Sequence, residues 1–266
     1  MLRSLKVDDS RIDQTMSSTT PQQTVHRFTV VGSTNDEAKT LAVAGALHGT
    51  IVRSDSQTAG RGRHGRRWES SVGNLYLSYI FRPETRVRTA AQIGYIAAVS
   101  VAEIIEELAV DVVQVTCKWP NDVLVDGKKV CGILAESSVS PGGTLDWIVI
   151  GIGINLTSHP HDVRWPATNL QAAFKRFIVA DEVFEALTCR LHGWMDSWLD
   201  AGFDRVRRAW LNRAWSIDSD ITVALQGRSV TGRLVGLDTE GALILQRVDG
   251  AKETIHYGEV FPAETR

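Results

Sequence analysis

The sequence predicts an α+β fold: a mixed, mainly antiparallel sheet with helices packed on it, followed by a small C-terminal β-barrel. The first observation is the Asp126-Gly127 pair between the apolar runs 123–125 and 129–134. It is a strong β-hairpin signal, because a tight hairpin turn needs positive φ angles. The second is that helix and strand patterns alternate irregularly, which disfavours repeated βαβ units. The third is a change of pattern near Ile217, after which short strands recur at a spacing of about ten residues.

The individual elements follow from hydrophobic periodicity and turn residues. Strands are predicted at residues 25–31, 50–54, 74–81, 123–125, 129–134 and 145–154, and in the C-terminal part at 221–225, 229–236, 242–247 and 253–257. Helices are predicted at residues 89–108, 181–199 and 203–215. Thr34 and Glu37 have the spacing of a capping box, so another helix is expected to begin near Asn35.

The strand that follows the Asp-Gly turn carries residues of chemical interest. Regular alternation would place Lys129 and Cys131 on one face and Val130 and Gly132 on the other. A glycine inside a strand usually marks a bulge or a close ligand approach, and the run 151–155 (GIGIN) repeats that feature in another strand.

Composition limits the class of protein. The 266 residues carry a net charge of −2 and are 43% hydrophobic, as in an ordinary soluble globular protein. We expect a mobile polar segment at 1–24, one large domain at 25–216 and a small one at 217–266. The three cysteines lack CxxC spacing, and no apolar run is long enough for a signal peptide or a membrane helix. A cytoplasmic protein is therefore expected.

A glycine–arginine loop at residues 60–68 (GRGRHGRRW) is the most unusual segment. Glycines let backbone N–H groups approach a ligand, and arginines bind phosphate or carboxylate oxygens through forked hydrogen bonds. Gly60, Gly62 and Gly65 match the dinucleotide fingerprint, but the following residues are a poor helix start. A P-loop is excluded because no Gly-Lys-Ser/Thr follows. A nucleic-acid-binding loop and a solvated basic loop without function remain open.

The segment Lys118-Trp119-Pro120-Asn121-Asp122 also combines reactive residue types. Pro120 fixes the backbone and favours an extended Trp119. Asn121 and Asp122 could then bind a ligand or Mg²⁺, although for this segment alone a turn with local hydrogen bonds is the better explanation.

Taken together, these segments resemble the catalytic domain of biotin–protein ligases. The matching pieces are Ser33-Thr34-Asn35, Gln57, GRGRHGRRW (60–68), NLYLS (74–78), KWPNDV (118–123), KVCGILAE (129–136) and GIGIN (151–155). They occur in the family's order and span about half of the chain. The resemblance implies a class II synthetase-like catalytic domain and an SH3-like C-terminal barrel.

The resemblance also implies a reaction and a site. Biotin would be activated with ATP to biotinyl-5'-AMP and passed to a lysine of a carrier protein. The catalytic residues would be Lys129, Arg61 and Asp122. Biotin would be bound by Ser33, Thr34, Asn35, Gln57, Arg61, Gly62, Arg63, Lys129 and Gly132. ATP and the adenylate would be bound by Gly60, Arg63, Arg66, Trp68, Lys118, Asn121, Gly153 and Asn155. Mg²⁺ would arrive with ATP, near Asp122, without a protein-only metal site.

The implied partner is the biotin carrier domain of acyl-CoA carboxylases, bound by a monomer or weak homodimer. Only about 24 residues precede the first strand, so we expect no DNA-binding domain, no repressor activity and no membrane association. The arginine expected near Ala263 for ATP contact is absent, which calls the nucleotide role of the C-terminal domain into question. Two alternatives stay open: a lipoate–protein ligase and a non-enzymatic arginine-loop nucleic-acid binder.

The resemblance also suggests which segments move. The loop 60–68 is expected to order on ligand binding, and segment 157–166 is a second candidate lid. Within that segment, His159 and His161 are expected to be surface histidines and not metal ligands.

Overall fold

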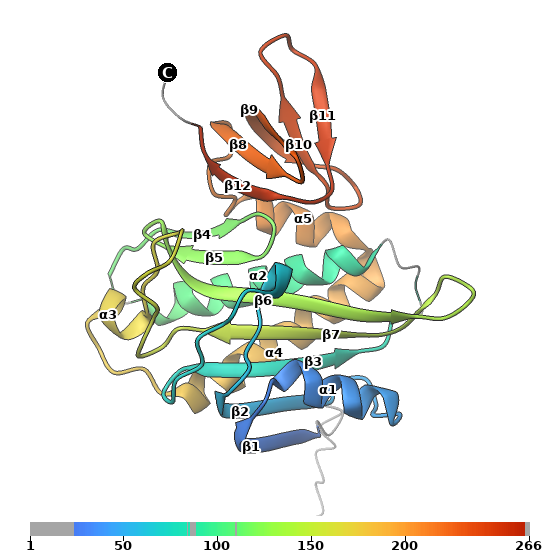
Figure 1. The fold of residues 1–266 in the computed structure, drawn as a ribbon, viewed down its shortest axis with the longest axis vertical. Coiled ribbons are helices and arrows are strands. Elements are labelled where there is room, and N and C mark those ends of the chain that lie inside the picture. The colour runs from blue at the N-terminus through green and yellow to red at the C-terminus, as the bar shows by residue number, and fades with distance from the viewer. Residues whose placement is uncertain (1–23, 84, 86–88, 110, 264–266) are drawn as a thin grey trace, which may run out of the picture.

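The computed structural model describes residues 24–83, 85, 89–109 and 111–263, so almost all of the expected N-terminal segment lies outside the described residues. The larger of two sheets has seven strands in the order β1-β2-β3-β7-β6-β5-β4 (Figure 1). Its strands are β1 (Val25–Val31), β2 (Ile51–Gln57), β3 (Leu75–Phe81), β4 (Val115–Lys118), β5 (Asp122–Val125), β6 (Lys128–Val139) and β7 (Leu145–Ile154). β1 and β2 are parallel and every other neighbouring pair is antiparallel, which confirms the predicted mixed, mainly antiparallel sheet.

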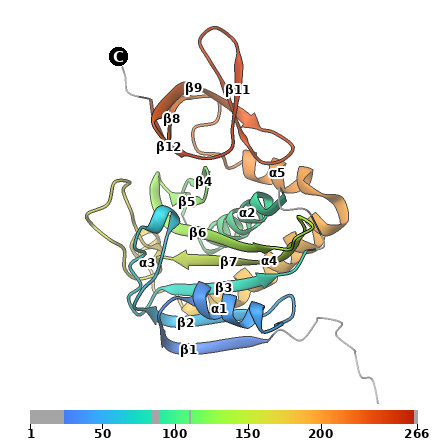
Figure 2. The ribbon, with the colours of Figure 1, turned by 45° about the vertical axis from the view of Figure 1, so that its right-hand side comes forward.

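Helices cover both faces of this sheet (Figure 2). α1 (Thr34–Val43) packs on one face against β2, β3 and β7. α2 (Ala90–Leu108) packs on the opposite face, against β4, β6 and β7, with α4 (Ala180–Ala201) and α5 (Phe203–Leu211) beside it. The remaining helices are short: the 3-10 turn η1 (Arg63–Gly65) and α3 (Leu170–Phe174). Most residues of α2 are buried, and the helix lies at the centre of the hydrophobic core.

The C-terminal residues form a separate five-stranded antiparallel sheet in the order β11-β10-β9-β8-β12. Its strands are β8 (Asp220–Leu225), β9 (Arg228–Leu237), β10 (Leu243–Gln246), β11 (Lys252–Ile255) and β12 (Glu259–Pro262). The last strand was not predicted. The small sheet is joined to α2 by Tyr95, whose hydroxyl donates to the carbonyl of Gly241, and by Gln92, whose Nε2 donates to the carbonyl of Thr239 at 3.3 Å. The two parts therefore share one hydrophobic core.

The Asp126-Gly127 hairpin is present, with positive φ angles of 48° and 74°. The predicted alternation after it is wrong. Val123 pairs with Cys131 and the adjacent Leu124 pairs with Lys129, so Val130 is an extra residue in β6. A bulge of this kind shifts the side-chain alternation by one residue. It places Lys129 on the same face as Gly132, and both face the pocket described below.

The predicted capping box at the start of α1 is also wrong. The helix begins at Thr34, and the N-cap residue is Ser33, which makes no side-chain cap hydrogen bond. The Thr34 hydroxyl instead donates to Gln57 Oε1 at 3.2 Å. Tertiary hydrogen bonds have taken the place of the local cap, and they direct this helix start toward the pocket.

Candidate functional site

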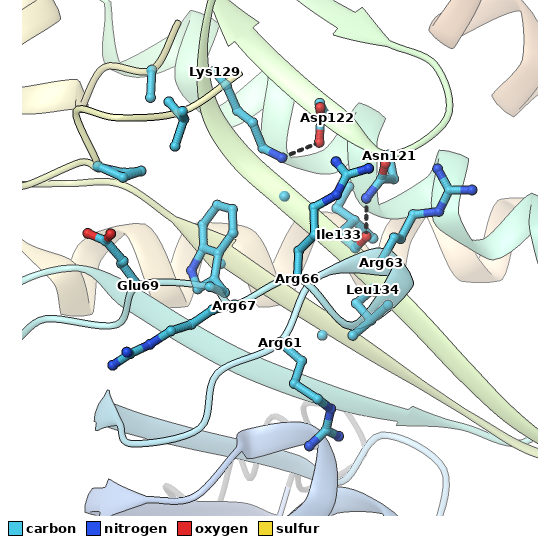
Figure 3. Close-up of a pocket in the computed structure, with 18 of the residues that line it drawn as sticks. Arg61, Arg63, Arg66, Arg67, Glu69, Asn121, Asp122, Lys129, Ile133 and Leu134 are labelled. Carbon is cyan, nitrogen blue, oxygen red and sulfur yellow. Dashed lines mark hydrogen bonds and ion pairs between the residues drawn. The ribbon is translucent and has the colours of Figure 1, made fainter. Parts of the chain in front are cut away.

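One large pocket opens on the α1 face of the sheet, between the loop 60–68, strand β6 and the C-terminal sheet (Figure 3). Its volume is about 360 Å³. Every predicted site residue except Gly60 lines it. Those residues are Ser33, Thr34, Asn35, Gln57, Arg61, Gly62, Arg63, Arg66, Trp68, Lys118, Asn121, Asp122, Lys129, Gly132, Gly153 and Asn155.

One end of the pocket is polar, and its side chains are held by a continuous hydrogen-bond chain. The Thr34 backbone N–H donates to Gln57 Oε1 at 2.8 Å. The buried Ser78 hydroxyl lies 2.8 Å from Thr34 Oγ1 and 2.6 Å from Asn35 Oδ1. Asn35 Nδ2 donates to Glu136 Oε2 at 2.7 Å. Buried polar networks of this kind fix each side chain in one rotamer, so this end presents preorganised polar groups to the pocket.

The other end is cationic. Lys129 Nζ lies 2.6 Å from Asp122 Oδ1, and Lys118 Nζ lies 3.9 Å from Asp122 Oδ2. Burial lowers the pKa of Lys118 to about 8, and the neighbouring cations Lys129, Arg66 and Arg63 add to this effect. Burial also lowers the pKa of Arg63. These four cations outnumber the two carboxylates at this end, Asp122 and Glu259, which makes it suited to an anion such as a phosphate chain.

The C-terminal sheet completes the cationic end. Arg63 Nη1 donates to the Gly258 carbonyl at 3.3 Å, and Arg66 forms an ion pair with Glu259. Phe261 lines the pocket beside Glu259. Strand β12 therefore contributes to the pocket although Ala263 replaces the expected arginine, so the C-terminal sheet has a direct structural role in the site.

Arg61 does not join this cationic cluster. Its Nη1 and Nη2 lie 2.5 and 2.6 Å from the two carboxylate oxygens of Asp36 on α1, and Nη2 lies 3.7 Å from Glu136. Figure 3 shows Arg66 directed toward Asp122, whereas Arg61 is directed to the opposite side. The hydrogen bonds from Arg61 hold the pKa of Asp36 well below its usual range. The structure thus separates Arg61 from Lys129, with which the sequence had grouped it.

Trp68 lies across the floor of the pocket. A Cβ added at Gly153 would lie 2.5 Å from the indole Nε1, and one added at Gly132 would lie 2.7 Å from indole Cζ3. Lys129 Nζ lies 5.3 Å from the indole centroid. From the sequence, these glycines were expected to make room for a ligand. In this structure they make room for the tryptophan ring, which forms a flat apolar surface beside the lysine.

Three of the motif residues hold the loops that surround the pocket. A Cβ at Gly60 would lie 2.5 Å from Ser70 Oγ, so Gly60 permits the turn into the loop but does not line the pocket. Asn121 Nδ2 donates to the Ile133 carbonyl at 2.7 Å. Asn74 Oδ1 accepts three backbone N–H groups at the start of segment 157–166.

Comparison with known proteins agrees with this geometry. Residues 28–155 match the model of the biotin/lipoate A/B protein ligase family, and residues 216–261 match that of the biotin protein ligase C-terminal domain. A biotin–[acetyl-CoA-carboxylase] ligase of Paracoccus denitrificans is 34% identical over 235 residues, covering 86% of this chain and 96% of that protein. The chain belongs to the biotin–protein ligases.

This ligase is also similar to two further proteins of the family. The bifunctional ligase/repressor BirA of Bacillus subtilis is 36% identical over 230 residues, which are 84% of this chain and 70% of that protein. The solved structure of a biotin protein ligase from Aquifex aeolicus, in complex with biotin and ATP, superposes with a TM-score of 0.76 at 28% identity. That match covers 90% of this chain and 97% of the Aquifex chain.

Sequence reasoning missed several residues that line or support the pocket of the ligase. They are Asp36, Ser78, Glu136, Arg164, Trp165, Glu259 and Phe261. Ser78 and Glu136 lie within the matched segments 74–78 and 129–136, so they could have been found by asking which strand residues share a face. Glu259 and Phe261 gave no such signal, because they reach the pocket only through the packing of the two sheets.

No metal cluster and no membrane span is found in the described part of the ligase. In residues 24–83, 85, 89–109 and 111–263, no three His, Cys, Asp or Glu side chains group to hold a metal ion. His159 and His161 lie with ring centroids 5.0 Å apart, and His159 Nδ1 is 2.8 Å from Asn169 Nδ2. Over the same residues, no helix is long and apolar enough to cross a bilayer.

Proposed function

We propose that this ligase activates biotin with ATP to form biotinyl-5'-AMP and pyrophosphate, and then transfers biotin to a lysine of a biotin carrier protein. The observation that carries the proposal is a pocket that combines a preorganised polar end with a cationic end. Biotin has a neutral polar ring and an anionic tail. Its ring matches the polar end of the pocket, and its carboxylate and the ATP phosphates match the cationic end.

The polar end is assigned to biotin. Ser33, Thr34 and Gln57 would hold the ureido ring, because all three line the pocket and Thr34 and Gln57 are fixed by their mutual hydrogen bonds. Further biotin contacts are proposed at Asn35, Gly62, Arg63, Lys129 and Gly132. The nucleotide contacts are proposed at Arg63, Arg66, Trp68, Lys118, Asn121, Gly153 and Asn155.

The first half-reaction joins two anions, so neutralisation of charge is its main requirement. A biotin carboxylate oxygen attacks the α-phosphorus, a new P–O bond forms, and the bond to the β-phosphate oxygen breaks to release pyrophosphate. Lys129 lies at the cationic end of the pocket beside Asp122 and is the proposed catalytic cation. The second cation is Arg63, in place of Arg61, because the Arg61 guanidinium is bound to Asp36.

In the second half-reaction, the amine of a carrier lysine attacks the acyl carbon, and AMP leaves with the C–O bond electrons. The amine must be neutral when it attacks. Asp122 is the carboxylate at the cationic end, and its ion pair with Lys129 orients that lysine. We propose that Asp122 also orients or deprotonates the incoming amine.

The residues present do not fit a protein-held magnesium site. Asp122 is engaged by Lys129, and Glu259 is engaged by Arg66. We propose that Mg²⁺ enters with the ATP phosphates, and no step of the mechanism is assigned to it.

The remaining proposals concern organisation and partners. We propose a catalytic domain at residues 25–216 and a C-terminal domain at 217–266. The proposed acceptor is the biotin carrier domain of an acyl-CoA carboxylase, bound in the cytoplasm by a monomer or weak homodimer without nucleic acid. Support comes from the names of the Paracoccus and Mycobacterium tuberculosis relatives, which are biotin–[acetyl-CoA-carboxylase] ligases.

The test is ATP- and biotin-dependent labelling of a purified biotin carrier domain, with ATP–pyrophosphate exchange measured for biotin and for lipoate. Biotin-dependent exchange and labelling are expected. Exchange with lipoate alone would favour a lipoate–protein ligase. Absence of exchange together with steeply salt-dependent DNA or RNA binding would favour a nucleic-acid binder.

A further inference from the structure

We infer that Arg61 is a positioning residue whose ion pair with Asp36 fastens the glycine–arginine loop to helix α1, and that it does not contact the reacting anions. The inference rests on the proposed function, because it divides the arginines of the loop between substrate binding and loop anchoring. It concerns the biotin end of the pocket, where the loop and α1 form facing walls.

The geometry of the pair directs the forked end of the Arg61 guanidinium to α1 and away from the cationic end of the pocket. Both terminal nitrogens are used by the two oxygens of one carboxylate, at 2.5 and 2.6 Å. Forked arginine–carboxylate pairs fix orientation as well as charge. The Arg61 side chain is 34% exposed and the Asp36 side chain is 48% exposed, so the pair is only partly buried.

The charge around Arg61 is balanced within the protein. Lys39 Nζ lies 2.9 Å from Asp36 and 2.7 Å from Glu136, and Arg61 lies within 3.7 Å of Glu136. These four side chains carry two positive and two negative charges, so they offer an incoming anion no net attraction. The cationic end differs, because its lysines and arginines outnumber the carboxylates of Asp122 and Glu259.

The backbone at Arg61 explains why this side chain restrains the loop as a unit, in addition to the contacts of Arg63 and Arg66. Arg61 forms an antiparallel bridge with Arg67, the Gly62 N–H donates to the Arg66 carbonyl at 2.7 Å, and the Trp68 N–H donates to the Gly60 carbonyl at 2.9 Å. The loop is therefore a small closed hairpin with Arg61 at its base. A tether at the base restrains every residue between the two arms.

The anchor point on α1 lies next to the proposed biotin contacts. Asp36 follows Thr34 and Asn35 in the first helical turn, where an acidic residue also interacts favourably with the helix dipole. Asn35 donates to Glu136, the same residue that approaches Arg61. The pair therefore holds the loop at a fixed distance from the side chains that would bind the ureido ring.

The test is a double-mutant cycle with Asp36→Asn, Arg61→Gln and the double variant, together with Arg61→Lys. An anchoring role predicts that each single variant raises the KM for biotin by about threefold to tenfold, that the double variant is no worse than either single, and that kcat changes by less than about twofold. Arg61→Lys should resemble Arg61→Gln, because lysine cannot make the forked pair. The amides of residues 60–68 should exchange faster in all four variants without ligand.

The opposite results would overturn the inference. If Arg61 binds the reacting anion, Asp36→Asn should leave biotin binding unchanged or tighten it, Arg61→Gln should lower kcat, and Arg61→Lys should retain activity. Asp181→Asn is the matched control, since it removes an ion pair with Arg27 and Arg53 outside the pocket and should leave KM unchanged. A wild-type protein without biotin-dependent exchange would instead refute the proposed function.

Discussion

Lys129 Nζ lies 2.6 Å from Asp122 Oδ1 at the cationic end of the pocket. The two residues come from neighbouring strands, and a bulge at Val130 turns Lys129 onto the face where Asp122 lies. The hairpin therefore brings Lys129 and Asp122 together, and this pair is the proposed centre of the chemistry.

Replacing Lys129 should abolish the activation of biotin. Lys129→Ala removes the cation proposed to stabilise the developing charge, so we expect kcat for ATP–pyrophosphate exchange to fall by about 100-fold to 1,000-fold. Circular dichroism should show an unchanged fold, since the Lys129 side chain is partly exposed. An exchange rate within a factor of about two of wild type would refute the assignment.

Asp122→Asn should separate the two half-reactions. Without the carboxylate, Lys129 loses its 2.6 Å partner, and we expect activation to slow by about tenfold. If Asp122 also orients or deprotonates the carrier amine, transfer from preformed biotinyl-5'-AMP should slow as well. Single-turnover transfer at a wild-type rate would show that Asp122 serves only the first step.

Gly153→Ala should displace Trp68. The added Cβ would lie 2.5 Å from the indole Nε1, a contact that requires the ring to move. We expect a loss of about 1–3 kcal/mol in unfolding free energy and a higher KM for ATP. Adding Trp68→Ala should restore the stability but not the KM. Gly142→Ala, at an open turn position, is the matched control.

Binding of ATP should weaken as pH rises through 8. Burial and the neighbouring cations lower the pKa of Lys118 from 10.5 to about 8, so the ammonium loses its proton within an accessible pH range. Because the protonated form attracts phosphate, the KM for ATP should rise above pH 8. In Lys118→Arg the guanidinium stays charged, and the KM should be flat from pH 7 to about 9.

The loop 60–68 should become more protected on ligand binding. In the structure it is held through Arg63 to Gly258, Arg66 to Glu259 and Arg61 to Asp36. These contacts are exposed or partly exposed, so the loop should still open and exclude water only when biotin and ATP are bound. Hydrogen exchange that is equal with and without ligands would contradict this prediction.

Local sequence was sufficient for much of the fold. Strands β1 and β7 have the predicted bounds, and the Asp126-Gly127 turn has the required positive φ angles. These features depend on interactions between residues that are close in the chain, such as side-chain alternation and turn conformation. The motifs of the loop and of segment 118–123 also predicted the family, because few folds need those residue types at that spacing.

Other features were decided by tertiary structure alone. The partner of Arg61 is set by the packing of α1 against the sheet, and the contribution of Glu259 is set by the position of β12. The face of Lys129 depends on a bulge that alternation cannot reveal. The sequence by itself determined which residue types gather at the pocket. Long-range packing decided that Arg66, and not Arg61, is directed toward Asp122, because side-chain direction depends on neighbours far away in the chain.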